Sequence, residues 1–256
     1  MSLERTLVMA QHNIRLLLGD PGPAVIFILT PLLVMAILRD TAEVVLVQEG
    51  FAGANGAEQV VPGFTVMFSF FWVAFVGRTF FVEHGWGTWE RLQSTSATGV
   101  EVLAGKLLPA FVAIAFQMVL LFVLGALLFD LDSAGPILAL ALVAVPLIGA
   151  VLAFTVAVVG VVASLQQMEA VANLVMMLFA ALGGALTPVF VLPTWAQEIS
   201  PATPSYWALK ASNEVILEGE GLSAVWGPAA VLVLFTAAFL LLAVAAFRMA
   251  DTKAVA

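Results

Sequence analysis

Six long apolar stretches, separated by shorter polar segments, dominate the pattern of this sequence. A helix needs about 20 mostly apolar residues to cross the hydrocarbon core of a bilayer. The pattern therefore predicts an all-α integral membrane protein, with six transmembrane helices in a single transmembrane domain over residues 1–256. The stretches lie at residues 23–38, 60–82, 107–129, 136–163, 170–192 and 224–247.

Residues 1–20 precede the first stretch and show a different helical pattern. Leu3, Leu7 and Ile14 recur at helical spacing, and polar residues mostly occupy the other side. This spacing predicts an amphipathic helix in the membrane interface; a solvated helix that leads into the first span is the alternative. Because polar residues interrupt the segment, it does not resemble the apolar core of a signal peptide, and we expect it to be retained.

The composition agrees with a membrane protein and excludes several kinds of site. Hydrophobic residues make up 62% of the chain and charged residues 10%, which excludes an ordinary water-soluble domain. The chain has no cysteine, and His12 and His84 lie far apart, so we expect no metal site and no catalytic residue. A net charge of −8 argues against a nucleic-acid partner, which requires clustered Lys and Arg.

The positive charges predict the orientation in the membrane, because cytoplasmic loops are enriched in Lys and Arg. Six spans place both termini on one side, and the basic residues then divide seven against two, which favours cytoplasmic N- and C-termini. The seven are Arg5, Arg15, Arg78, Arg91, Lys106, Arg248 and Lys253, and the two on the outer side are Arg39 and Lys210. Ten of the carboxylates fall on the outer side: Asp40, Glu43, Glu49, Glu58, Asp130, Asp132, Glu198, Glu214, Glu218 and Glu220.

Two connections are too long to be simple turns: residues 83–106, predicted to be cytoplasmic, and residues 188–223, predicted to be external. Both mix aromatic with polar residues, so we expect them to be structured. In the first, Trp89 and Leu92 lie at helical spacing, which predicts a short amphipathic helix suited to a groove on a partner. The alternative is a helix that packs against the protein's own inner surface.

The order of residues in these two connections resembles the membrane subunits of type 2 ATP-binding-cassette exporters, the drug, polysaccharide and lipid exporter class with the type V exporter fold. The resemblance covers essentially the whole chain. In and around the first connection it rests on Arg78, Val82-Glu83, Gly87-Thr88, Glu90-Arg91-Leu92, Gly105-Lys106 and Gln117. In the second it rests on Pro188, Phe190, Leu192-Pro193, Trp195, Pro201, Pro204, Tyr206 and Lys210.

The resemblance implies two further elements of the fold: a cytoplasmic coupling helix between spans two and three that docks on an ATP-binding subunit, and short external helices between spans five and six. The implied coupling residues are Glu83, Gly87, Trp89, Glu90, Arg91 and Leu92. The family often carries more basic residues after the glutamate, where this chain has His84, Gly85 and Trp86.

The chain lacks the motif that it would need to hydrolyse ATP. A phosphate-binding loop requires G-x-x-x-x-G-K-[ST]. In the nearest stretch, Gly99 to Lys106, five residues separate the glycines and Leu107 replaces the hydroxyl residue. We therefore expect no enzymatic activity and no cofactor on this chain, with ATP and Mg bound by a partner ATPase.

Few polar residues interrupt the spans: Arg78, Gln117, Thr155 and Asn173. Such groups usually face the protein interior or a water-filled path; Arg78 is expected to anchor span two near its cytoplasmic end. The resemblance places spans two and five along the substrate path, which suggests as lining residues Phe68, Phe71, Phe75, Asn173, Met176 and Met177. Lipid-facing or helix-packing roles are the alternative. Soft, apolar side chains suit a drug, antibiotic or lipid better than a sugar polymer.

We therefore expect the transmembrane subunit of an ATP-driven exporter in a bacterial or archaeal cell membrane. Its expected partners are an ATP-binding subunit, a second permease protomer in a homo- or heterodimer, membrane lipid, and a hydrophobic or amphipathic compound that is moved out of the cytoplasm or inner leaflet. An ion-gradient-driven secondary transporter is an alternative, although the spans lack a carboxylate at mid-membrane. A non-transporting immunity or sensing protein is a second alternative.

Overall fold

The computed structural model describes residues 22–85, 99–136 and 138–253, together with Gln11 and Gly19. Within these residues it is all helical, and six helical segments are long and apolar enough to cross a membrane. The spans are α2 (Gly22–Gln48), α3 (Ala57–Ser69) with α4 (Phe71–Gly85), α6 (Gly99–Phe129), α7 (Leu138–Val161), α8 (Leu165–Gly183) and α11 (Leu222–Lys253). The predicted fold class and number of spans are confirmed.

Short helices fill the connection between α8 and α11, as the sequence predicts. They are η1 (Val189–Val191), α9 (Thr194–Ile199), η2 (Ser200–Ala202) and α10 (Pro204–Ile216). Proline at the first position of α10 fits a helix start, where its missing N–H is not needed. The Thr203 side chain caps this start by accepting a hydrogen bond from the Tyr206 N–H. The predicted interfacial helix at residues 1–20 and most of the coupling segment lie outside the described residues.

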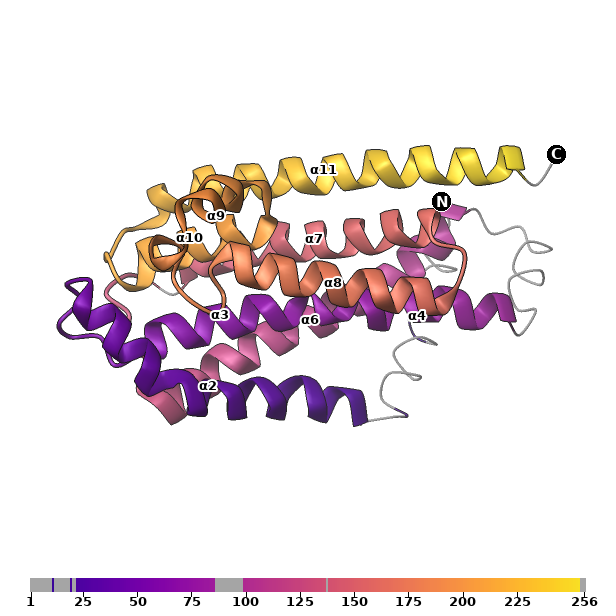
Figure 1. Cartoon of the computed structure of the whole chain (residues 1–256). Coiled ribbons are helices and arrows are strands. Elements are labelled where there is room, and N and C mark those ends of the chain that lie inside the picture. Colours follow the sequence, from indigo (N-terminus) through magenta and orange to yellow (C-terminus); the bar gives the residue numbers. More distant parts are fainter. Residues whose placement is uncertain (1–10, 12–18, 20–21, 86–98, 137, 254–256) are drawn as a thin grey trace.

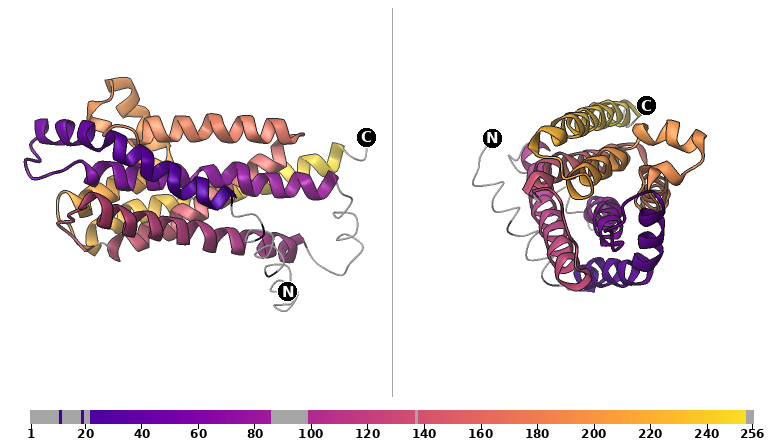
Figure 2. Two further views of the ribbon diagram at one scale, coloured as in Figure 1. Left: turned by 90° about the horizontal axis from the view of Figure 1, so that it is seen from below. Right: turned by 90° about the vertical axis from the view of Figure 1, so that its left-hand side faces the viewer.

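The spans run alternately up and down, so the connections divide between two ends (Figure 1). We call one the α10 end; it holds residues 49–56, 130–136 and 184–221. The other, the α7–α8 end, holds residues 162–164, the last turn of α4 and the first turn of α6. Seen along the bundle, α3 and α4 are surrounded by the other spans (Figure 2). In the most apolar part of this central span 78% of residues are buried, compared with 11% in α2.

Several spans differ in extent from the apolar stretches that predict them, and the first and the fifth show why. The first helix was expected to end near residue 38 but continues to Gln48, because the polar residues after Leu38 contain no helix breaker before Gly50. The fifth was expected over 170–192 but covers Leu165–Gly183. Ser164 caps its start by accepting a hydrogen bond from the Gln167 N–H, and Gly184 ends it at a φ of 91°.

The central span is interrupted at Phe70, which the apolar pattern does not indicate. The Phe70 N–H donates to the Met67 carbonyl at 3.1 Å, and the Val73 N–H donates to the Phe70 carbonyl at 3.1 Å. Both bonds join residues three apart, which is the tighter 3₁₀ spacing. The Ser69 hydroxyl donates to the Val66 carbonyl at 2.6 Å and so adds a bond on the first side of the break.

Glycines allow the central span to approach its neighbours closely. A Cβ at Gly63 would overlap the carbonyl oxygen of Ala185 and lie 3.3 Å from its carbonyl carbon. A Cβ at Gly125 of α6 would lie 2.7 Å from both methyl groups of Val61. In a bilayer the lipid is as apolar as leucine, so association of spans depends on such close packing rather than on the hydrophobic effect.

Polar side chains buried within the bundle form hydrogen bonds between spans. The Gln117 side chain of α6 accepts a bond from the Trp72 indole and donates to the Phe27 carbonyl at 3.2 Å, which joins three helices. The Gln59 amide donates to the Gly184 carbonyl at 2.8 Å. Gln117 and Thr155 therefore face the interior as expected, whereas Arg78 and Asn173 are exposed on this chain.

Candidate functional site

Most of the predicted coupling residues cannot be placed. Gly87, Trp89, Glu90, Arg91 and Leu92 lie outside the described residues. Glu83 belongs to the last turn of α4, where only its backbone is described. The structure does show the two helices that this segment joins, because α4 ends at Gly85 and α6 begins at Gly99.

The first turns of α6 contact the last turns of α4. The Lys106 ammonium donates to the Thr79 carbonyl at 3.4 Å and lies 4.4 Å from the centre of the Phe80 ring. Lys106 is 7% exposed and Glu101, one turn earlier, is 3% exposed. Burial of a charged group is costly unless it has partners. These contacts fix the end of α4 and the start of α6, the two helices that flank residues 86–98, relative to each other.

Sequence analysis did not identify Glu101 and Lys106 as buried, because the third apolar stretch begins only at Leu107. The helix begins eight residues earlier, at Gly99. The sequence does contain a signal for this. Charged residues that directly precede an apolar stretch can belong to the same helix and be buried in the protein. The same extension places Gly99 to Lys106 in the first two turns of α6.

The candidate substrate-path residues fall into two separate groups. The aromatic group faces α2: Phe68 stacks on Phe71 with ring centres 4.8 Å apart, and Phe75 lies 5.9 Å from Phe27. Phe71 lies 6.1 Å from the same ring of Phe27. These rings pack within the bundle together with Trp72, whose ring lies 5.3 Å from that of Phe75.

The second group lies on α8. Met176 is buried in the main core, whereas Asn173 is exposed and Met177 is 65% exposed. Leu174 and Leu178 are exposed on the same side of this helix. Residues at these spacings share one helix face, so α8 presents an apolar face with one amide that is exposed in the described part of the chain.

Among the described residues the two groups contact different helices: Phe71 and Phe75 lie against Phe27 of α2, whereas the second group lies on α8. Phe70 of the central span, rather than Phe68, Phe71 or Phe75, reaches the α8 side, where its ring lies 5.3 Å from Phe179. Sequence analysis did not distinguish among these phenylalanines, because a span rich in them offers an aromatic residue on every face.

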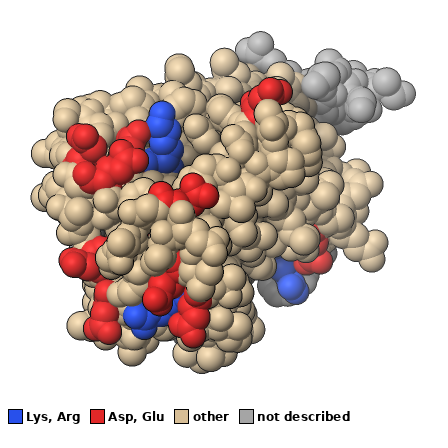
Figure 3. Space-filling model, turned by 60° about the vertical axis from the view of Figure 1, so that its left-hand side comes forward, with Lys and Arg blue, Asp and Glu red and all other residues tan. Residues whose placement is uncertain are grey.

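At the α10 end, carboxylates outnumber cations, and Figure 3 shows them gathered on this part of the surface. Seven of the ten carboxylates predicted to share one side lie in the connections at this end, with Lys210. The other three, Asp40, Glu43 and Glu58, lie with Arg39 on the adjoining turns of α2 and α3. Polar contacts order the α2–α3 connection there: Arg39 donates to the Asn55 carbonyl at 3.0 Å, and the Asn55 side chain donates to the Asp130 carbonyl at 2.7 Å. Glu58 accepts a bond from the Asn55 N–H at 3.1 Å.

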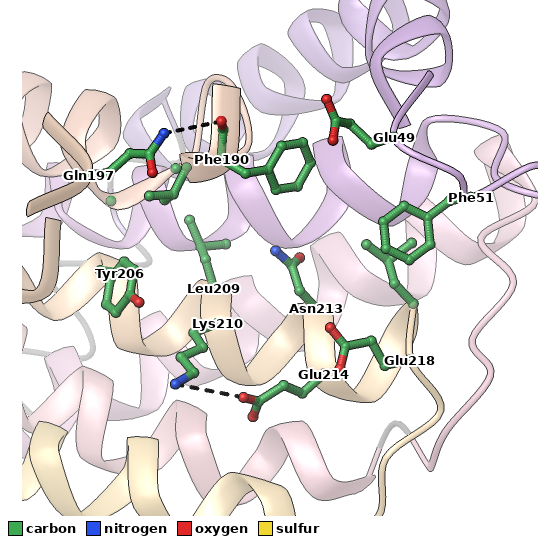
Figure 4. A pocket seen from close by; sticks show the side chains of 14 residues that line it. Glu49, Phe51, Phe190, Gln197, Tyr206, Leu209, Lys210, Asn213, Glu214 and Glu218 are labelled. Carbon is green, nitrogen blue, oxygen red and sulfur yellow. Dashed lines mark hydrogen bonds and ion pairs between the residues drawn. The ribbon is translucent and has the colours of Figure 1, made fainter. Parts of the chain in front are cut away.

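A pocket with a volume of about 550 Å³ opens among these segments. It lies between the end of α2, the C-terminal end of α8, η1 with α9, and one face of α10 (Figure 4). Asn213 and Leu209 extend from α10 toward Phe190, and Glu49 and Phe51 face them from the α2–α3 connection. Sequence analysis did not predict this pocket, because its walls depend on how residues 183–218 fold back on themselves and on Glu49 and Phe51, which come from a distant part of the chain.

Burial raises the pKa of the Glu214 carboxyl in this pocket above its ordinary value of 4.5. The neighbouring ammonium of Lys210, 3.9 Å away, opposes that increase, while the carboxylates of Glu218 and Glu220 add to it. One oxygen of Glu214 is buried and has no hydrogen-bond partner among the described residues. The pocket thus contains a carboxyl group whose negative charge is only partly compensated.

Comparison with known proteins identifies the family. The model of the ABC-2 family transporter proteins matches residues 22–245, from the start of α2 into the last turns of α11. The linearmycin resistance permease protein LnrN of Bacillus subtilis (strain 168) is 25% identical over 190 residues, which are 74% of this chain. The chain spans about half the length of that relative, 49%. This chain belongs to the ABC-2 family of transporter proteins, as a multi-pass permease subunit.

Proposed function

We propose that this chain is the transmembrane subunit of an ATP-driven exporter, which moves a hydrophobic or amphipathic compound out of the cytoplasm or inner leaflet. The observation that carries the proposal is the family match over residues 22–245, on a bundle with six apolar spans. The name of the relative, a linearmycin resistance permease, supports a compound of this class rather than a sugar polymer.

In this proposal a separate ATP-binding subunit hydrolyses ATP, and ATP and Mg bind there. In the same proposal, the ATP-binding subunit contacts this chain at the predicted coupling residues, Glu83, Gly87, Trp89, Glu90, Arg91 and Leu92. The support from the structure is indirect. Lys106 and Phe80 join the start of α6 to the end of α4, so a force applied to the segment between them reaches the central span.

A second permease protomer, identical or related, completes the transporter. The exposed apolar face of α8, with Leu174 and Met177, is the surface that we assign to this contact and to the path beside it. Met176 lies directly behind that face. Phe68, Phe71 and Phe75 pack against α2 in this conformation, so they reach a substrate in the proposal only when α2 and the central span separate.

The orientation is also part of the proposal: both termini and the α7–α8 end are cytoplasmic, and the α10 end is external. The support is the division of the basic residues, seven against two, together with the gathering of carboxylates at the α10 end. The membrane is that of a bacterial or archaeal cell.

The decisive experiment is affinity purification of the tagged chain from its own cell. We expect an ATPase subunit to copurify and its turnover to change when hydrophobic compounds are added. The pair Glu90→Lys with Arg91→Glu is expected to weaken that association, whereas Glu198→Lys, at the α10 end, leaves it intact. If no ATPase copurifies, or if the paired reversal binds it as the wild type does, the proposed coupling is wrong. If an ionophore abolishes efflux and ATP depletion does not, the protein is a secondary transporter.

A further inference from the structure

The pocket at the α10 end combines aromatic surfaces with polar groups. Phe51, Phe190 and Tyr206 line it from three different segments, and its volume of about 550 Å³ lies within the range of small-molecule sites. Phe190 is 43% exposed, so its ring remains available to a ligand. The chain therefore forms a concave apolar surface large enough for an organic molecule, outside the bundle core.

The position of Phe190 is fixed by the polypeptide around it. The Gln197 side chain donates to the Phe190 carbonyl at 3.2 Å and to the Leu192 carbonyl at 2.7 Å. These bonds hold the η1 turn against α9. The fold itself thus holds the Phe190 side of the pocket, which lowers the entropic cost of binding there.

The charge of the lining is negative. Glu49, Glu214 and Glu218 contribute three carboxylates, and among the described residues Lys210 is the sole cation of the lining, which gives 1 − 3 = −2 with all groups ionised. Lys210 is itself engaged: its ammonium lies 3.9 Å from Glu214 and 5.5 Å from the centre of the Trp207 ring. A ligand therefore meets uncompensated carboxylates next to aromatic faces.

We propose that this pocket binds amphipathic organic cations, compounds with one positive charge on an aromatic or aliphatic body. The carboxylates favour the charge, and the aromatic faces favour both the body and the cation. In the proposed transporter, on which this part rests, the pocket lies on the external side and receives a cationic compound as it leaves the path. An anion of the same shape is disfavoured by the same groups.

Two ions of nearly identical shape and opposite charge test the proposal: tetraphenylphosphonium and tetraphenylborate. Their binding to the purified full-length chain in detergent is measured by equilibrium dialysis. We expect tetraphenylphosphonium to bind and Glu218→Gln to weaken it about fivefold, which corresponds to about 1 kcal/mol at 1.4 kcal/mol per tenfold. Glu214→Gln is expected to weaken it further because it also leaves Lys210 unpaired in the lining.

Two further variants separate the site from general charge effects. Lys210→Met is expected to increase the affinity for tetraphenylphosphonium, since it removes the cation from the lining. Glu198→Gln removes a carboxylate from the exposed side of α9, outside the pocket, and is expected to leave the affinity unchanged. Glu218 is exposed, so its substitution keeps the test valid even if Glu214→Gln does not fold.

The proposal is overturned if wild type and both glutamate variants bind tetraphenylphosphonium equally, or if tetraphenylborate binds as tightly and its affinity does not rise in Glu218→Gln. These outcomes are independent of the ATPase experiment. Carboxylate-dependent binding to a chain that copurifies no ATPase would retain the pocket and reject the exporter. Copurification with charge-independent binding would retain the exporter and reject the pocket.

Discussion

At the scale of single residues, the most demanding contact is the one between Gly63 and the backbone after α8. A Cβ at residue 63 would overlap the carbonyl oxygen of Ala185, which cannot move without displacing the backbone that ends α8. We expect Gly63→Ala to destabilise the protein by about 1–3 kcal/mol, the usual range for overpacking. The measurement is the thermal unfolding midpoint in detergent, with unfolding monitored by tryptophan fluorescence.

Gly227→Ala is the matched control for that substitution. Apart from adjoining residues of its own helix, its added Cβ meets nothing within 4 Å, and the residue lies inside α11. An alanine there is expected to shift the midpoint far less than Gly63→Ala, because the helical gain of alanine over glycine, about 0.5–1 kcal/mol, is opposed by contact of its Cβ with the ring of Pro228, the next residue in the helix. Equal midpoints for Gly63→Ala and Gly227→Ala would show that the close approach at Gly63 is not required.

Glu214 gives the protein a pH-dependent contribution to stability. Because burial raises its pKa above 4.5 in the folded state, the folded chain binds a proton where the unfolded chain has already released it. The contribution is therefore most favourable at low pH, and it falls as the pH rises from 4.5 through the raised pKa. Lys210 limits the effect, Glu218 and Glu220 enlarge it, and Glu49 faces the same pocket from the α2–α3 connection.

We expect Glu214→Gln to remove this dependence. The unfolding midpoint of the wild type, relative to the variant, should fall as the pH rises above 4.5, and the profile of Glu198→Gln should follow the wild type. Thermal unfolding in detergent between pH 4 and pH 8 provides the measurement. Parallel profiles for the wild type and Glu214→Gln would mean that the carboxyl titrates as it does in the unfolded chain.

At the scale of elements, contact between α4 and α8 offers a way to test movement. A Cβ at Gly77 would lie 3.0 Å from Met168 Cγ, the position that a cysteine sulphur at residue 168 takes. This spacing fits a disulfide. The chain has no cysteine of its own, so Gly77→Cys with Met168→Cys introduces the sole thiol pair. We expect oxidation to link α4 to α8 and to abolish most efflux, and a reductant to restore it.

The pair Gly149→Cys with Thr236→Cys is the control for that experiment. The two Cβ positions lie 4.0 Å apart, between α7 and α11, and these helices make the most extensive contact between spans in the structure. We expect the oxidised control to retain efflux, because a link between two helices that already pack along each other adds little constraint. Efflux that survives the link between α4 and α8 would indicate that transport does not require these two helices to move relative to each other.

The sequence predicts the six spans well, because each must be apolar over the thickness of a membrane. It does not predict the break at Phe70 or the continuation of α2 to Gln48, since neither depends on hydropathy. The pocket is less predictable still. Phe51, Phe190 and Tyr206 come together only through tertiary contacts, such as the Gln59 bond to the Gly184 carbonyl that joins α3 to the end of α8. Local periodicity contains no information on such contacts.

At the scale of the whole molecule, the proposed orientation gives each end of the bundle a side of the membrane. Gly221 and Gly99 lie at opposite ends, and a Cβ at either position meets nothing within 4 Å. Because the natural chain lacks cysteine, a single cysteine at either position reports its own exposure to a membrane-impermeant maleimide. We expect Gly221→Cys to be labelled on intact cells and Gly99→Cys to be labelled only after permeabilisation. The reverse pattern would place the α10 end in the cytoplasm, and the carboxylate-lined pocket would then face the compartment from which the compound is taken.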